Sequence, residues 1–156
     1  TIEPMSSLAE PPSTPDEIEH YMTDLASYHQ DHLETTVPAY LCGDISHGIA
    51  DRDRNIVHDN YDLFEFSIPY MWEFHFKNTD SFYNSTFGFT DEECRNGIVD
   101  LPRLKDLIFD NTERWPIDDV FGYLEIGGPK LGGDYSDPEL EKNLVESIRN
   151  LRRVFD

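Results

Sequence analysis

Residues 64–76 read FEFSIPYMWEFHF, and this stretch decides the expected fold. Every even position in it is apolar or aromatic, namely Phe64, Phe66, Ile68, Tyr70, Trp72, Phe74 and Phe76. The odd positions include Glu65, Ser67, Pro69, Glu73 and His75. Apolar residues at every second position are typical of a β-strand with one buried face, which Pro69 would bend or interrupt. The alternative is a helix, with Tyr61, Phe64, Ile68, Trp72 and His75 on one face, but Pro69 and the many aromatic rings count against it.

Helix signals lie on both sides of this stretch. Thr14-Pro15-Asp16-Glu17 has the residues of a capping box and begins a helix that ends before Pro38. Asp100-Leu101-Pro102 begins a second helix, and Ser136-Asp137-Pro138-Glu139 begins a third that runs to the end of the chain. Residues 120–126 are expected to form a short strand, and 127–134 a glycine-rich loop.

The sequence therefore predicts one α+β domain, with about three helices packed on a small, aromatic-rich antiparallel sheet. Residues 1–13 hold three prolines and little periodic apolar content, so we expect a flexible N-terminal tail. The globular domain is expected to span residues 14–156.

The composition of the chain limits the kinds of partner that it can bind. The 156 residues include 32 Asp and Glu against 12 Lys and Arg, which gives a formal net charge of -20. This charge argues against direct nucleic-acid binding and against an anionic membrane surface. No apolar run approaches the roughly 18–20 residues that span a bilayer. Two cysteines are too few for a disulfide scaffold, and we expect a cytoplasmic protein.

The excess negative charge lies mostly in the first part of the chain. Residues 1–94 hold 19 acids and three bases, and residues 95–156 hold 13 acids and nine bases. A highly charged domain associates quickly with a partner of opposite charge, which favours a basic protein surface as the partner. The carboxylates expected to bind that partner are Asp51, Asp53, Asp59, Asp62, Asp91, Glu92 and Glu93. One alternative is that the charge only keeps the protein in solution. The other is that Arg52 and Arg54 neutralise the first group of carboxylates, Asp51, Asp53, Asp59 and Asp62, within the chain itself.

The sequence contains none of the common motifs of catalytic, cofactor-binding or metal-binding sites. The chain has no phosphate loop, nucleophile elbow, Cys-x-x-Cys pair or His-Glu-x-x-His helix, so we predict no catalytic residues, metal ligands or cofactors. His29 and His32 lie three residues apart on one expected helix face, which leaves a metal-dependent enzyme as an alternative. In that case His47 and Asp44 would be the other residues to suspect.

Residues 123–155 (YLEIGGPKLGGDYSDPELEKNLVESIRNLRRVF) and the small, acidic character of the chain carry one family resemblance. The stretch resembles immunity proteins of bacterial polymorphic-toxin and contact-dependent growth inhibition systems. The resemblance implies an inhibitor that binds a cognate toxin domain, often a basic nuclease, and blocks its active site. It supplies no individual site residues.

The leading hypothesis is therefore a non-enzymatic immunity protein whose carboxylates meet a basic toxin surface, with aromatic anchors at the centre of the interface. The same charge would suit a DNA mimic that occupies a DNA-binding protein. The third hypothesis is the metal-dependent enzyme built around His29 and His32.

Overall fold

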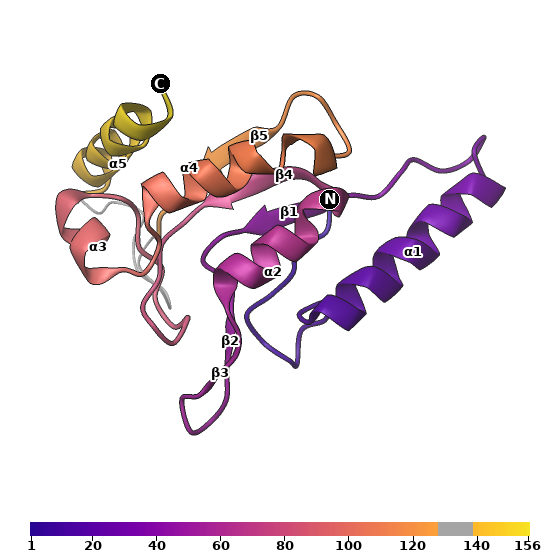
Figure 1. Ribbon diagram of the computed structural model, residues 1–156, viewed down its shortest axis with the longest axis horizontal. Helices are drawn as coiled ribbons and strands as arrows, with labels where there is room; N and C mark the ends of the chain where they lie inside the picture. Colours follow the sequence, from indigo (N-terminus) through magenta and orange to yellow (C-terminus); the bar gives the residue numbers. More distant parts are fainter. Residues whose placement is uncertain (128–138) are drawn as a thin grey trace.

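The computed structural model describes residues 1–127 and 139–156, and the statements below concern these residues (Figure 1). Its main sheet has three strands in the order β1 (Leu41–Asp44), β4 (Met71–Phe76) and β5 (Phe121–Leu124). Two short strands, β2 (Ile49–Ala50) and β3 (Ile56–His58), form a separate antiparallel hairpin.

Five α-helices occur among the described residues, where about three were predicted, and several of them begin at capping residues. They are α1 (Pro15–Asp31), α2 (Asn60–Ser67), α3 (Asp91–Asn96), α4 (Leu101–Asp110) and α5 (Leu140–Phe155), with short 3-10 helices at Ile68–Tyr70 and Thr112–Arg114. The predicted capping box of α1 is confirmed, since Thr14 and Glu17 cap each other reciprocally. Asp100 caps α4 as expected. The predicted glycine loop from residue 128 and the third capping signal up to Pro138 lie outside the described residues.

The prediction of a strand over residues 64–76, bent or interrupted at Pro69, is confirmed for residues 71–76 and wrong for residues 64–70. Asp59 caps the helix α2 by accepting a hydrogen bond from the Tyr61 backbone, and the chain stays helical through Tyr70. Pro69 sits at the start of the 3-10 turn, where proline fits, and only residues from Met71 onward are extended. The alternation does not mark one buried face, because Phe64, Ile68 and Phe74 are buried while Trp72 is exposed and the odd position Met71 is fully buried.

The predicted antiparallel sheet is also wrong, because both strand pairs of the main sheet are parallel. α2 connects β1 to β4, and α3 and α4 connect β4 to β5. At the far edge, Ile2 forms a parallel bridge to Leu41. Parallel neighbours require such long helical crossovers, and a prediction that replaced α2 with strand had no crossover to use.

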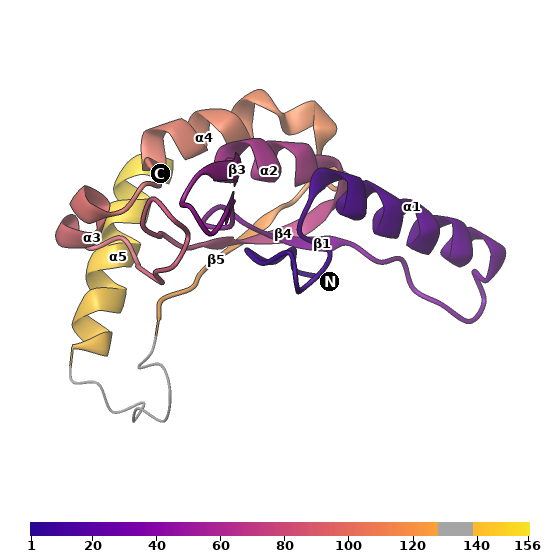
Figure 2. The same ribbon diagram turned by 90° about the horizontal axis from the view of Figure 1, so that it is seen from below.

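The first residues of the chain, expected to be a flexible tail, lie against the sheet. The Ile2 backbone donates to the Tyr40 carbonyl at 2.9 Å and accepts from the Cys42 backbone at 2.8 Å. Figure 2 shows α2 and α4 on one face of the sheet and the N-terminal segment on the other, with α1 extending beyond the sheet. The sheet thus consists of successive β/α units with helices on one side, as in a segment of a (β/α) barrel.

The apolar core lies between the sheet and the helices. Phe64 of α2 meets Phe74 of β4 edge to face, and Phe76 meets Phe155 of α5 in the same way. The largest fully buried apolar residues besides Phe64 are Ile18, Leu41, Ile45, Ile68, Met71, Phe89 and Leu104. This packing fixes the strands so that their carboxyl ends meet at one edge, where parallel β/α proteins place their sites. In the parts of the chain that the structure describes, no helix has the length and apolar character needed to cross a membrane.

Candidate metal centre

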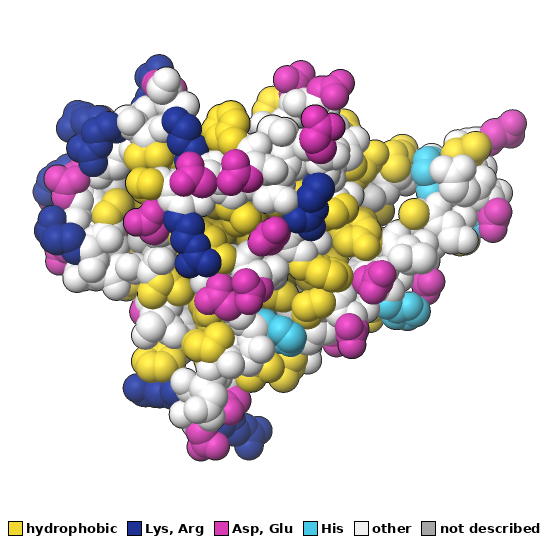
Figure 3. All heavy atoms as spheres, viewed as in Figure 1, with side chains coloured by type: hydrophobic (Ala, Val, Ile, Leu, Met, Phe, Trp, Pro, Cys, Tyr) yellow, Lys and Arg dark blue, Asp and Glu magenta, His cyan; other side chains and the backbone are white. Residues whose placement is uncertain are grey.

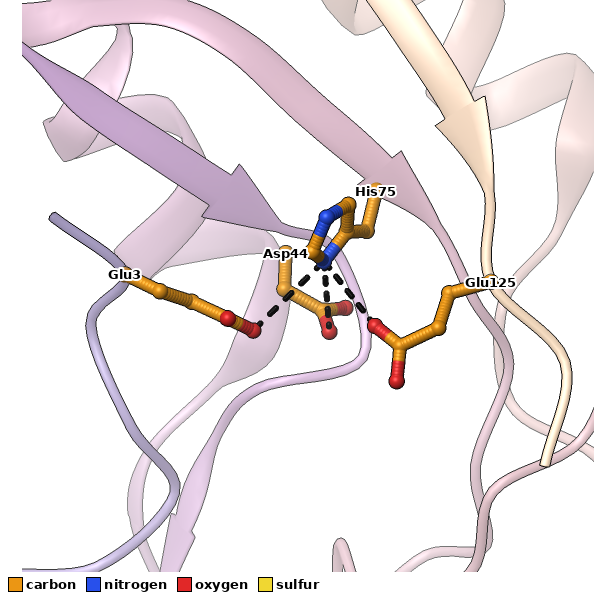
Figure 4. A group of neighbouring side chains, drawn as sticks. All are labelled: Glu3, Asp44, His75 and Glu125. Atoms are coloured by element: carbon orange, nitrogen blue, oxygen red, sulfur yellow. Dashed lines mark ion pairs between the residues drawn. The ribbon is translucent and has the colours of Figure 1, made fainter. Parts of the chain in front are cut away.

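Four ionisable side chains meet at the carboxyl ends of the parallel strands (Figure 4). Glu3 follows the Ile2 bridge, Asp44 ends β1, His75 is the fifth residue of β4, and Glu125 follows β5 directly. The register of the sheet explains their meeting, since Asp44 lies opposite His75 and the Glu125 backbone donates to the Phe76 carbonyl. We call these four residues the carboxylate–histidine cluster.

The geometry of the cluster suits a small cation. One ligand atom from each residue lies within 4.8 Å of all the others. His75 Nδ1 is 2.9 Å from Glu125 Oε2, 3.5 Å from Glu3 Oε1 and 4.0 Å from Asp44 Oδ2. Metal–ligand bonds of about 2.0–2.2 Å place neighbouring ligand atoms about 3 Å apart and opposite ones about 4.4 Å apart, which is the spread seen here.

Two atoms of the cluster are buried without a well-formed hydrogen bond. They are Asp44 Oδ2 and His75 Nδ1. The other oxygen of Asp44 is fixed, because Oδ1 accepts from the Ser46 backbone at 2.8 Å. Both atoms have ionic neighbours instead, with Lys77 and His47 beside Asp44 Oδ2 and Glu125 beside His75 Nδ1, so a cation bound here would replace these contacts.

Lys77 and His47 border the cluster. Lys77 Nζ is 3.2 Å from Asp44 Oδ2 and 3.0 Å from Glu125 Oε1. His47 Nε2 is 3.1 Å from Asp44 Oδ2, and its Nδ1 is 2.6 Å from the Pro4 carbonyl. These contacts hold the Asp44 carboxylate from two sides and tie the N-terminal segment to β1.

The electrostatics show carboxylates and cations that stabilise each other's charged forms. The contact with His75 lowers the pKa of Glu125 to about 2, and it also lowers the pKa of Glu3. Cys42, Glu125 and Glu3 together raise the pKa of His75 to about 12. Burial lowers the pKa of Lys77, but Asp44 and Glu125 outweigh it and raise that pKa overall. The lowered values favour the ionised carboxylates and the raised values favour protonated His75 and Lys77, so each of the four groups is stabilised in its charged form.

A pocket of about 190 Å³ adjoins the cluster. His47 and Lys77 form its wall on the cluster side. The remainder of the wall is rich in hydroxyl and amide groups, from Ser6, Ser7, Ser46, Asn84 and Ser85. Such a lining suits a small ligand that carries several hydrogen-bonding groups.

The first group of predicted partner-binding residues lies elsewhere, along and after the β2–β3 hairpin. Asp51 accepts hydrogen bonds from Asn55 and from the backbone of Asp53, which orders the hairpin loop and lowers the pKa of Asp51. Asp59 is the N-cap of α2, and Asp62 lies in the first turn of that helix. Arg54, considered as an internal counter-charge, lies over the ring of Phe82.

The second group, Asp91, Glu92 and Glu93, forms the first turn of α3. Glu93 completes a capping box with Thr90, and Asp91 accepts from Asn150 at 3.0 Å. Lys and Arg side chains gather around α3 and α5 in Figure 3, so this acidic turn lies in a basic part of the surface. The structure does not bring the two groups of predicted residues into the cluster.

His29 and His32, the predicted alternative, lie at the end of α1, which extends away from the sheet in Figure 1. His29 Nδ1 contacts the Thr36 hydroxyl at 2.7 Å, and His32 Nδ1 contacts the Tyr28 carbonyl at 2.8 Å. Both imidazoles therefore help to end the helix. Of the suspected residues, Asp44 is in the cluster and His47 borders it.

Sequence reasoning missed Glu3, His75, Lys77 and Glu125. A signal was present, since an ionisable residue stands at or near the carboxyl end of each apolar strand: Asp44 after Leu41-Cys42-Gly43, His75 within β4 and Glu125 after β5. That signal has meaning only in a parallel sheet, where such ends lie side by side.

The comparisons with known proteins agree with this reading of the fold. No protein-family model matches the chain. No curated protein matches it in sequence. A solved structure from Rhodospirillum rubrum ATCC 11170, named "Putative Xylose isomerase", matches with a TM-score of 0.65 at 20% identity. The match covers 97% of this chain and 45% of the other, so this chain spans less than half of the solved protein's length.

This match overturns two expectations. The resemblance of residues 123–155 to immunity proteins is wrong, because the fold is that of the Rhodospirillum protein over nearly the whole chain. The expectation that the chain is not an enzyme is contradicted as well, since the matching protein is named as an enzyme. Binding to a basic toxin partner has no observation for or against it and stays a prediction.

Proposed function

We propose that this chain provides a divalent-metal site for an enzyme that isomerises a small sugar. The observation that carries the proposal is the carboxylate–histidine cluster: four ligand atoms that lie within 4.8 Å of one another at the carboxyl ends of the parallel strands. Glu3, Asp44, His75 and Glu125 would hold the metal. Carboxylates with one imidazole suit Mn²⁺, Mg²⁺ and similar cations, whereas soft metals prefer sulfur.

Charge supports a divalent ion over a monovalent one. The cluster and its border contain three carboxylates, the Lys77 ammonium group and a His75 whose raised pKa keeps it protonated in the free chain, so a cation that displaces the His75 proton would meet two net negative charges. Buried charges are costly unless they are compensated, and one divalent cation balances this set.

The substrate class follows from the pocket beside the cluster and from the name of the Rhodospirillum protein. The polar wall offers hydroxyl and amide partners for substrate hydroxyls, and Lys77 offers a positive charge beside them. A bound metal would polarise a carbonyl or hydroxyl oxygen as a Lewis acid. In this proposal Lys77 keeps Asp44 and Glu125 oriented, while His47 holds Asp44 and the N-terminal segment in place.

Calorimetric titration with MnCl₂ tests the metal site directly. The wild-type chain should bind one Mn²⁺, and Asp44→Asn should weaken Mn²⁺ affinity by about 100-fold. Loss of a residue that only supports a metal ligand already lowers affinity by about 10–100-fold, so loss of a ligand itself should reach at least the upper value. Asp51→Asn is the matched control, since Asp51 is also a hydrogen-bonded aspartate but lies in the hairpin loop. Equal losses in both variants, or no binding by the wild type, would contradict the proposed site.

A separate assay tests the reaction. The chain is incubated with D-xylose and a panel of other aldoses and ketoses, with Mn²⁺ or with EDTA, and interconversion is followed by NMR. We expect metal-dependent isomerisation of at least one sugar that the Asp44→Asn variant does not perform. Tight Mn²⁺ binding without turnover of any sugar would contradict the substrate class while leaving the metal site in place.

A further inference from the structure

The second ring nitrogen of His75 has a partner outside the carboxylate–histidine cluster. His75 Nε2 lies 3.4 Å from the Sγ atom of Cys42. Cys42 is a buried, free cysteine in β1, and its Sγ also lies 4.0 Å from the Gly43 carbonyl. The His75 ring is therefore held between carboxylates on its Nδ1 side and a sulfur on its Nε2 side.

The parallel register explains this arrangement. Asp44 lies opposite His75, and Cys42 precedes Asp44 by two residues, so both point to the same face of β1. One strand thus supplies a carboxylate for one ring nitrogen and a thiol for the other.

A neutral imidazole carries its proton on one nitrogen and a lone pair on the other. A metal ligand needs the lone pair on the metal side, and the opposite N–H usually donates to a group that fixes the ring. At His75 the metal side is Nδ1, which faces Glu3, Asp44 and Glu125. The proton then belongs on Nε2, where the Cys42 sulfur is placed to accept it while the thiol hydrogen faces the Gly43 carbonyl.

We propose that Cys42 is a positioning residue for the metal site: its sulfur accepts the Nε2–H of His75 and so keeps Nδ1 free and aimed at the metal. This inference rests on the proposed metal site and adds a residue to it. The competing explanation is that Cys42 only fills space in β1.

Two substitutions separate the explanations. Cys42→Ser keeps a hydrogen-bond acceptor but changes the packing, whereas Cys42→Val fills the space but accepts nothing. A positioning role predicts that Mn²⁺ affinity, measured by calorimetry, falls by about 10-fold in Cys42→Val and by much less in Cys42→Ser. A packing role predicts the reverse order. The same pair of changes at Cys94, which is exposed in α3, is the control and should leave affinity unchanged.

A measurement on the unaltered chain completes the test. With ¹⁵N-labelled histidine and bound Zn²⁺, NMR should show His75 protonated at Nε2 and ligated through Nδ1. Ligation through Nε2, or an unchanged Mn²⁺ affinity in Cys42→Val, would overturn the role of Cys42 while leaving the metal site intact. Failure of the wild type to bind Mn²⁺ would overturn the metal site itself, so the two failures are distinguishable.

Discussion

Asn78 shows how a single polar residue can organise the region behind the site. Its side chain is fully buried and makes three hydrogen bonds: Nδ2 donates to the Glu93 carbonyl, and Oδ1 accepts from the backbones of Thr79 and Val99. Its own backbone pairs with Phe87 in both directions. One amide thus joins the end of β4 to α3 and to the start of α4, and it does so one residue after Lys77.

Asn78→Ala should therefore be among the most destabilising single changes in the chain. It removes three hydrogen bonds and leaves two buried backbone donors without partners, so we expect a loss of about 2–4 kcal/mol in the free energy of unfolding. Urea denaturation followed by circular dichroism measures this loss. The control is Asn84→Ala at an exposed position, which should change stability by less than about 0.5 kcal/mol. A loss below about 1 kcal/mol for Asn78→Ala would contradict the linking role.

At the scale of elements, the start of α1 depends on the ionisation of Glu17. Glu17 Oε2 accepts from the backbone and hydroxyl of Ser13 and from the backbone of Thr14, and these bonds lower the pKa of Glu17 below its usual 4.5. A carboxyl whose pKa is lowered on folding stabilises the fold above its unfolded pKa. That stabilisation is lost as the pH falls through the folded value.

We therefore expect the amide protons of Ser13 and Thr14 to lose protection below about pH 4.5, before the rest of α1 does. Hydrogen exchange followed by mass spectrometry at several pH values measures this. Glu17→Gln should remove the pH dependence, and Glu19→Gln, at an exposed position in the same helix, should leave it unchanged. Protection that is independent of pH in the wild type would count against the carboxylate cap.

The same scale shows what the sequence could and could not predict. The starts of α1 and α4 and the strand at residues 120–126 were predictable, because capping residues, prolines and short apolar runs act within a few residues. The stretch 64–76 was not, because a helix buried on one face and a buried strand both place aromatic residues there. Only the N-cap at Asp59, whose role depends on local backbone geometry, distinguishes the two.

At the scale of the whole molecule, the site exists only because the sheet is parallel. Glu3, Asp44, His75 and Glu125 are separated by 41, 31 and 50 positions, so no local motif contains two of them. Asp44 and His47 drew attention because they share a short polar segment, whereas Glu3 fell in the expected tail and His75 in the expected alternation. Predicting the cluster required the order and direction of the strands, which depend on packing between distant elements.

The metal site has a consequence for the stability of the whole chain. A ligand that binds only the folded state stabilises it, by about 2.7 kcal/mol at 100 times its dissociation constant. For a chain of this size, that gain corresponds to a rise of roughly 5–10 °C in the melting temperature. The cluster joins the N-terminal segment, β1, β4 and the end of β5, so the cation would hold together elements that are far apart in sequence.

Differential scanning calorimetry should therefore show this rise in melting temperature with Mn²⁺ in the wild type and in Asp51→Asn, but not in Asp44→Asn. NaCl at the same ionic strength is the control for general screening of the net charge of -20, and an equal rise with NaCl would show that Mn²⁺ acts on the surface charge rather than at the cluster.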